Sequence, residues 1–193
     1  MEKGRNMKCH LRGLMAGLVL AICFGAMLPQ IASAASAYDI NRQVDAALSA
    51  LYASNPAAVE LSRTAKGVLV FPSVTKAGFI FGGEFGVGAL RENGQSVGYY
   101  SVAAASYGLQ IGIQNFGYAL FLMDDNSLSF LNSQGGWQLG VGPSIVVMDQ
   151  GMARSLTTAT ELQGVYAFIF DQQGLMAGMG LQGSKITPYT PDF

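Results

Sequence analysis

Three basic residues lie close together around one short apolar run. Arg63 and Lys66 precede the run Val68–Phe71, and Lys76 follows it. Guanidinium and ammonium groups bind phosphate oxygens through charge-assisted hydrogen bonds, so this cluster predicts a site for a phosphate group. The alternative is that the three side chains are the solvated ends of a helix and a turn. Lys66 would also be favourable at a helix C-terminus in either case.

One acidic residue, Glu84, stands among glycines in a segment that alternates like a strand. Successive side chains of a strand point to opposite faces, so Glu84 shares its face with Gly82, Gly86 and Gly88. Gln110 occupies a similar glycine-bearing face further along the chain. A strand face made mostly of glycines predicts sharp curvature, a bulge, or the close approach of another backbone or a ligand. Two interpretations of Glu84 and Gln110 stay open: a polar pocket, or a solvated face.

Nucleophilic and metal-based chemistry has few residues to use. Cys9, Cys23 and the single histidine, His10, all lie in the first 34 residues. The rest of the chain holds no thiol nucleophile, no Ser-His pair and no His- or Cys-ligated zinc site. The G-x-G-x-x-G run 178–183 lies in a strand pattern, whereas a dinucleotide site needs it to open a helix. We expect no cofactor, no metal and no enzymatic activity; a hydrolase that uses Glu84 is the enzymatic alternative.

The N-terminus has the order of a secretory signal peptide. Basic residues precede the apolar run Gly13–Leu28, and Ala32-Ser33-Ala34 supplies an A-x-A cleavage pattern. We predict that residues 1–34 are the signal peptide and residues 35–193 are one domain. The alternatives are an uncleaved anchor, for which the run is short, and a lipoprotein acylated at Cys23.

Charge argues against nucleic acid as a partner. Without the first 34 residues the chain keeps seven basic and eleven acidic residues, a net charge of −4. Affinity for nucleic acid rests on Lys and Arg that neutralise phosphates, and this balance gives no general attraction to anionic lipid either. The adjacent acids Asp124 and Asp125 are expected to cap local backbone in a turn.

The sequence predicts helices first and strands afterwards. Apolar residues recur at helical spacing over 38–52, with Asp39 as the expected N-cap. Asn55 and Pro56 are typical of the start of a second helix, which Gly67 ends. The predicted strands are 68–71, 77–90, 98–114, 116–123, 128–131, 137–148, 165–170 and 175–182, with an irregular tail after them. This order predicts an α+β fold: a strongly curved or barrel-like antiparallel β-sheet with N-terminal helices packed against it.

Several separated motifs resemble one known family. The segment Ala65–Leu90, AKGVLVFPSVTKAGFIFGGEFGVGAL, is similar to the signature of the SYLF family, a lipid-binding domain found in bacteria and eukaryotes. The resemblance continues through Ser106–Gln114, Gly136–Val141 and Gly174–Gly183, and it covers nearly all of the chain after residue 38. Motifs in the right order are more specific than any one of them.

The resemblance implies a non-enzymatic protein that binds phospholipid or a membrane surface. Arg63, Lys66 and Lys76 are the matching basic positions. Eukaryotic members bind phosphoinositides partly through a basic N-terminal amphipathic helix, and the matching helix 38–52 lacks that basic cluster. Together with the signal peptide, the resemblance predicts an exported bacterial protein of the periplasm, the cell envelope or the extracellular space. Actin, which some fungal members bind, is not an expected partner of such a protein.

An alternative of another class is a small outer-membrane β-barrel. Glycine-rich alternating strands and the terminal Phe193 favour it. Pro188 and Pro191 interrupt the last segment and a helical N-terminus precedes the strands, which disfavours it.

Overall fold

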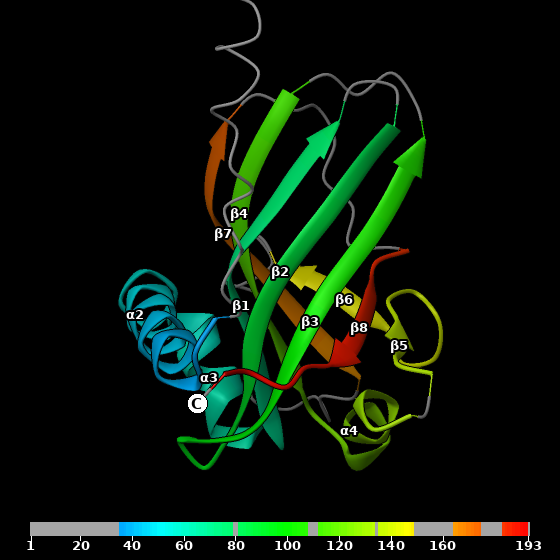
Figure 1. Ribbon diagram of the computed structural model, residues 1–193. Coiled ribbons are helices and arrows are strands. Elements are labelled where there is room, and N and C mark those ends of the chain that lie inside the picture. The colour runs from blue at the N-terminus through cyan, green and yellow to red at the C-terminus, as the bar shows by residue number, and fades with distance from the viewer. Residues whose placement is uncertain are drawn as a thin grey trace, which may run out of the picture. The chain divides into compact units, whose positions relative to one another are not determined.

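A curled β-sheet is the framework of the protein, as its computed structural model shows (Figure 1). The structure describes residues 35–78, 81–107, 112–133, 135–148, 164–174 and 183–192. Ala34–Phe193 forms one compact unit. The described helices are α2 (Ala37–Ser54), α3 (Pro56–Thr64) and α4 (Asp125–Leu131). The described strands are β1 (Gly67–Gly78), β2 (Phe81–Glu92), β3 (Gln95–Tyr107), β4 (Gly112–Leu122), β5 (Trp137–Gln138), β6 (Ile145–Met148), β7 (Val165–Gly174) and β8 (Lys185–Pro188).

These strands form one sheet with the order β5-β8-β3-β2-β1-β4-β7-β6. Neighbouring strands are antiparallel, except that β6 runs parallel to β7. The sheet curls into a half-barrel with a concave and a convex face (Figure 1). The predicted α+β fold with a strongly curved sheet is confirmed. The sheet is not purely antiparallel as predicted, because β6 runs parallel to β7.

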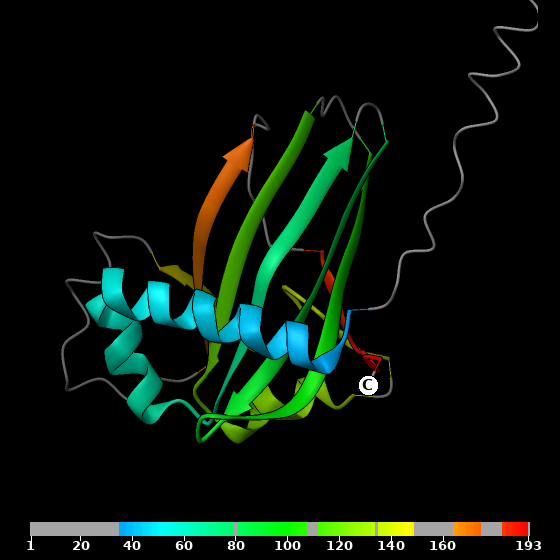
Figure 2. The ribbon, with the colours of Figure 1, turned by 60° about the vertical axis from the view of Figure 1, so that its left-hand side comes forward.

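Helices α2 and α3 cover part of the convex face, with α2 lying across the strands (Figure 2). The buried residues of α2 recur every three or four positions and so form one stripe along the helix. That stripe consists of Ile40, Val44, Ala47 and Leu51. It packs in one apolar cluster with strand residues such as Val70, Ala89 and Phe121. The predicted packing of the N-terminal helices on the sheet is therefore confirmed.

A second apolar cluster fills the concave face. Tyr118 and Phe71 from the central strands meet Trp137 of β5 and Ile186 of β8 in this cluster, and all four are buried. The partly buried Leu128 of α4 packs against it. The sheet thus separates two cores, and each face of a central strand contributes to a different one.

β1 and β2 form a hairpin, so the prediction of one strand over 77–90 is wrong. Gly78 pairs with Gly82, and the two strands run antiparallel. β1 does not stop at Pro72 as predicted. The register of β1 shifts on both sides of Pro72, against β2 and against β4. A bulge there accommodates a residue without an N–H group. The prediction of one strand over 98–114 is wrong in the same way, because this range covers most of β3 and the start of β4.

This bulge explains why the concave face of β2 carries glycines. A Cβ atom on Gly88 would lie 2.0 Å from the carbonyl oxygen of Val70, and one on Gly86 would lie 2.9 Å from that of Ser73. Neither position has room for a side chain, because the bulged backbone of β1 approaches β2. The expectation of a bulge and a close backbone approach beside these glycines is confirmed.

The ends of the first two helices differ in detail from the prediction. Ser36, not Asp39, is the N-cap of α2, and its hydroxyl accepts a hydrogen bond from the Asp39 N–H at 3.1 Å. Asp39 lies inside the first turn, where acids are also favourable. Asn55 caps α3 as predicted. Gly67 does not end α3; Ala65 is its C-cap, and Gly67 begins β1.

The predicted strand 128–131 is wrong, because these residues belong to helix α4. Asp124 is its N-cap and accepts a hydrogen bond from the Ser127 N–H at 2.7 Å. Its second carboxylate oxygen accepts from the Gly164 N–H at 2.7 Å. The expectation that Asp124 caps local backbone is confirmed. The capping signal of Asp124 outweighs the strand-like apolar spacing of four residues.

The C-terminal part also departs from the expected strands. The predicted strand 137–148 is split into β5 and β6, with Gly140 and Gly142 between them at positive φ. The tail is not irregular, since β8 fills the place between β5 and β3. The predicted strand 175–182 lies outside the described residues. Over the part of the chain that the structure describes, no helix has the length and apolar character to cross a membrane.

Candidate functional site

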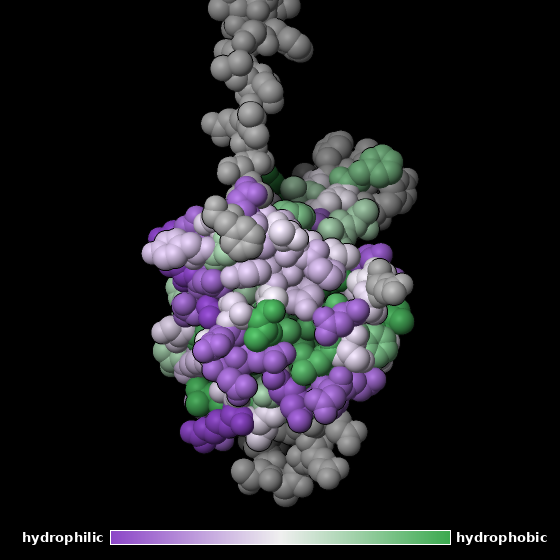
Figure 3. Space-filling model, turned by 60° about the horizontal axis from the view of Figure 1, so that its bottom comes forward, coloured by the Kyte–Doolittle hydropathy of each residue, from purple (hydrophilic) through white to green (hydrophobic). Residues whose placement is uncertain are grey.

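A cleft of about 580 Å³ opens between α2, α3 and the turn that joins β2 to β3. Figure 3 views the end of the molecule where α3, α4 and this turn lie, and hydrophilic side chains there surround a smaller apolar patch. The start of β1, at Gly67 and Val68, also lines the cleft. A helix end, a second helix and a strand turn therefore meet around one concavity.

The lining of the cleft is positively charged. Its charged groups are the cations Arg63, Lys66 and Arg91 and the single acid Asp45. Residues 35–193 contain only seven basic residues and carry a net charge of −4. Three of those seven line this one cleft, and each of them is paired with an acid, Glu60, Asp125 or Asp45.

Two of the cations are held only by exposed ion pairs. Arg63 contacts Glu60 at 2.9 Å, and both side chains are about two-thirds exposed (66% and 61%). Lys66 lies 3.7 Å from Asp125, whose side chain is 85% exposed. Exposed pairs contribute at most about 1 kcal/mol. An incoming anion can therefore replace either partner at little cost.

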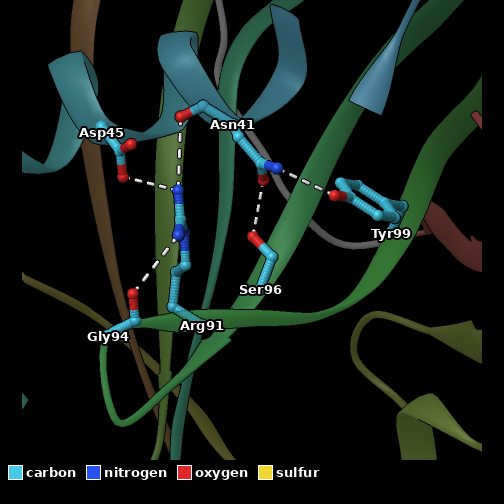
Figure 4. A network of polar contacts seen from close by, with 6 residues as sticks. All are labelled: Asn41, Asp45, Arg91, Gly94, Ser96 and Tyr99. Carbon is cyan, nitrogen blue, oxygen red and sulfur yellow. Dashed lines mark hydrogen bonds and ion pairs between the residues drawn. The ribbon is translucent and has the colours of Figure 1, made fainter. Parts of the chain in front are cut away.

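Arg91 is held more firmly, at the centre of the network in Figure 4. Its side chain is only 12% exposed and pairs with Asp45 of α2. It also donates to the Asn41 carbonyl at 3.3 Å and to the Gly94 carbonyl at 3.4 Å. Asn41 in turn donates to the Tyr99 hydroxyl at 2.9 Å. This network fixes α2 against β2 and β3 and fixes the back of the cleft.

Hydroxyl groups complete the polar lining. Tyr52, Ser49 and Ser62 contribute them from α2 and α3. Burial raises the pKa of Tyr52, and a hydrogen bond with Ser62 opposes this rise. Tyr52 is therefore neutral at physiological pH and can act as a hydrogen-bond donor. Cations beside neutral donors can bind the oxygens of a phosphate or a carboxylate.

Of the three predicted basic residues, the structure brings together two. Arg63 and Lys66 line the same cleft. Lys76 lies nine residues along β1 from Gly67, roughly 30 Å away at the usual rise of a strand. It pairs with Glu84 on one side and Gln114 on the other. The sequence distance between these cations is short, but an extended strand separates them in space.

Glu84 lies on the concave face and is only 6% exposed, so the interpretation of a solvated face does not hold at this residue. The Ser184 hydroxyl donates to it at 3.2 Å. Burial raises the pKa of Glu84, while the Ser184 hydrogen bond and the positive charge of Lys76 act in the opposite direction. Gln110, its predicted neighbour, lies outside the described residues.

Arg91 lines the cleft but was not among the predicted site residues. It ends an apolar strand and looks like an ordinary solvated residue beside Glu92. Only the pairing with Asp45, 46 positions away, makes it part of the cleft. No local pattern signals such a contact. Within the described ranges, no group of three or more His, Cys, Asp or Glu side chains is placed to hold a metal ion.

Comparison with known families decides the relationship of this chain. Residues 103–191 match the family model described as Ysc84, Las17-binding protein actin regulator. This segment belongs to that family, the SYLF family. SYLF is a lipid-binding family. The predicted resemblance to it is confirmed at the level of the family by the match over residues 103–191, which does not include the motif Ala65–Leu90. No curated protein matches the chain.

The matched segment of the SYLF domain begins in β3 and runs through β4, α4 and the strands that follow. The cleft lies before it, since its lining residues fall between Asp45 and Gly94. The family match therefore establishes what kind of domain this is, and the geometry of the N-terminal half locates the charged cleft.

Proposed function

We propose that this protein is an exported, non-enzymatic lipid-binding protein of the bacterial cell envelope. In this proposal the cleft between α2, α3 and the β2–β3 turn receives the phosphate of an anionic lipid headgroup. The observation that carries it is the gathering of Arg63, Lys66 and Arg91 in one concavity of an acidic chain. Membership of a lipid-binding family supports lipid as the source of the phosphate.

The three cations would have different roles. Arg63 and Lys66 are exposed at the rim and would exchange their weak partners for the headgroup. Arg91 would stay in its network and add positive potential at the back of the cleft. The Tyr52 hydroxyl would donate a hydrogen bond to a phosphate or glycerol oxygen, whereas the Ser62 hydroxyl already donates to the Val59 carbonyl at 2.7 Å.

The α2 helix is not available to lie on a membrane in this conformation. Its apolar stripe is already buried against the convex face of the sheet. An amphipathic helix binds a bilayer through such a stripe. Recognition of a headgroup by the cleft therefore fits this structure better than insertion of α2.

Export and the lack of enzymatic activity belong to the same proposal. The signal-peptide order of the first 34 residues supports export to the periplasm or envelope. The absence of Cys and His from the sequence after residue 34 supports a binding role. Actin regulation, which the family description names, is not proposed, because an exported bacterial protein would not meet actin filaments.

Co-sedimentation with liposomes tests the headgroup site. Residues 35–193 are used, so that the apolar run Gly13–Leu28 cannot cause binding by itself. We expect the wild type to pellet with phosphatidylglycerol vesicles and not with phosphatidylcholine vesicles. The double variant Arg63→Glu/Lys66→Glu should stay in the supernatant.

A control with the same change in net charge separates a site from a general charge effect. Arg42 and Lys185 are exposed and do not line the cleft. The variant Arg42→Glu/Lys185→Glu should therefore keep most of its binding. Equal loss in both double variants would mean that no local site exists. Failure of the wild type to pellet with anionic vesicles would contradict the proposal itself.

A further inference from the structure

The concave face carries a row of polar side chains at the end of the sheet far from the cleft. Glu84 of β2, Lys76 of β1 and Gln114 of β4 are direct partners across three neighbouring strands. Glu84 and Gln114 are buried, with exposures of 6% and 5%, and Lys76 is half-buried. Polar side chains in a core are normally paired with one another or with another group.

These polar groups have hydrogen-bonding capacity that the described residues leave unused. The Gln114 Oε1 atom and the hydroxyl of Tyr118, a fully buried residue of the same face, are buried with no hydrogen-bond partner. The Lys76 side chain makes no hydrogen bond or ion pair with another described residue, although its charge influences Glu84. Glu84 receives one hydrogen bond, from Ser184. Unpaired buried donors and acceptors favour the binding of a group that satisfies them.

The next row toward the strand ends has no side chains. Gly82, Gly78 and Gly112 are partners across the same three strands, two residue pairs beyond Glu84, Lys76 and Gln114 and therefore on the same face. Three adjacent strands give a strip about 10 Å wide. The N–H and C=O groups are used within the sheet, so the face of the strip consists mainly of Cα–H groups and is apolar. A chain of methylene groups can lie along such a surface.

The charge of the polar row selects the kind of ligand. Lys76 and Glu84 together carry no net charge when both are ionised, so the row gives an anion little advantage. A hydroxyl group can donate to Gln114 Oε1 and accept from Lys76 Nζ or the Tyr118 hydroxyl. We propose that this end of the concave face is a second ligand site, which binds an uncharged, hydroxyl-bearing headgroup at Glu84, Lys76 and Gln114 with its alkyl chain over the glycine strip.

This second site does not rest on the headgroup cleft. The two lie at opposite ends of β1 and have opposite requirements, one for an anion and one for a neutral polar group. The variant Arg63→Glu/Lys66→Glu should therefore bind a neutral amphiphile as the wild type does. Loss of one site without the other distinguishes failure of this inference from failure of the proposed function.

Calorimetric titration of residues 35–193 with 1-octanoylglycerol tests the inference. The variant Gly78→Leu fills the strip, and Ala77→Leu adds the same side chain at the neighbouring position on the opposite face. Neither Gly78 nor Ala77 has a positive φ, so a leucine can adopt the backbone conformation at both positions. We expect Gly78→Leu to weaken binding at least tenfold and Ala77→Leu to leave it unchanged. Equal effects of the two variants, or no binding to the wild type, would overturn the site.

The polar row is tested by Tyr118→Phe and by two further ligands. Tyr118→Phe removes an unpaired hydroxyl, so it should fold normally and bind 1-octanoylglycerol about tenfold more weakly, the effect of one hydrogen bond. Octanoate should bind more weakly than 1-octanoylglycerol, and a preference for octanoate would refute the neutral headgroup. If free glycerol bound as tightly as 1-octanoylglycerol, the proposed contact of the alkyl chain with the glycine strip would be refuted.

Discussion

Replacement of Arg91 by methionine should destabilise the protein by loosening α2 from the sheet. Methionine keeps the unbranched stem but loses the ion pair with Asp45 and the donations to the carbonyls of Asn41 and Gly94. Asp45 is 66% exposed, so that pair contributes about 1 kcal/mol or less. The two long hydrogen bonds, at 3.3 and 3.4 Å, contribute about 0.5 kcal/mol each at the low end of their range. The expected loss is about 2 kcal/mol.

Thermal and urea unfolding of residues 35–193 measure this loss. For a domain of this size it corresponds to a decrease in Tm of about 4–8 °C. Arg42→Met is the matched control, because Arg42 is 67% exposed and pairs only with Asp39 in its own helix; it should change Tm by about 1 °C or less. Equal effects of the two substitutions would refute the conclusion that the Arg91 network fixes α2 on the sheet.

Three further predictions concern buried or capping groups. Burial raises the pKa of Glu84 above its ordinary value of 4.5, so the folded protein holds this proton more tightly than the unfolded chain. The free energy of unfolding should therefore fall as pH rises through the pKa of Glu84 in the folded protein. Urea unfolding of the variant Glu84→Gln should not show this fall. Identical pH profiles of the wild type and the variant would contradict the prediction. Asp124→Ala removes the α4 cap and the bond to Gly164 and should cost about 2–4 kcal/mol at pH 7, against less than about 0.5 kcal/mol for Asp125→Ala. The hydrogen bonds to Gly164 and Ser127 lower the Asp124 pKa, so its contribution should disappear as pH falls through that lowered pKa. Gly88→Ala should cost about 3 kcal/mol or more by calorimetry, because its Cβ would meet backbone at 2.0 Å; an unchanged Tm would refute the close approach.

The regular patterns of the sequence predicted the large features of the fold. Helical spacing located α2, and alternation with turns indicated a curved sheet. Alternation did not show where one strand ends, because the hairpin between β1 and β2 turns at Gly78 and Gly82, and glycines occur along the strand as well. The strand-like residues of α4 became helical because Asp124 caps the backbone in front of them. A capping residue four positions before the short apolar segment that begins at Leu128 was the signal that could have shown this.

The candidate site was predictable only in part. Arg63 lies in the last turn of α3 and Lys66 directly follows the C-cap Ala65, so their proximity follows from local structure. Lys76 is separated from them by an extended strand, and recognising this required knowing that β1 continues through Pro72. Arg91 and Asp45 meet because α2 folds across the convex face. Such long-range contacts depend on the tertiary arrangement, which no spacing in the sequence encodes.

Nuclear magnetic resonance of residues 35–193 with the soluble lipid dihexanoyl-phosphatidylglycerol tests the headgroup cleft most directly. We expect backbone amide signals of Ser49, Ser62 and Gly94, which line the cleft, to shift in a saturable way. Dihexanoyl-phosphatidylcholine should shift them much less, and Arg63→Glu/Lys66→Glu should abolish the response. Shifts that appear elsewhere and spare these three residues would contradict the assignment of the cleft as the site of an anionic headgroup.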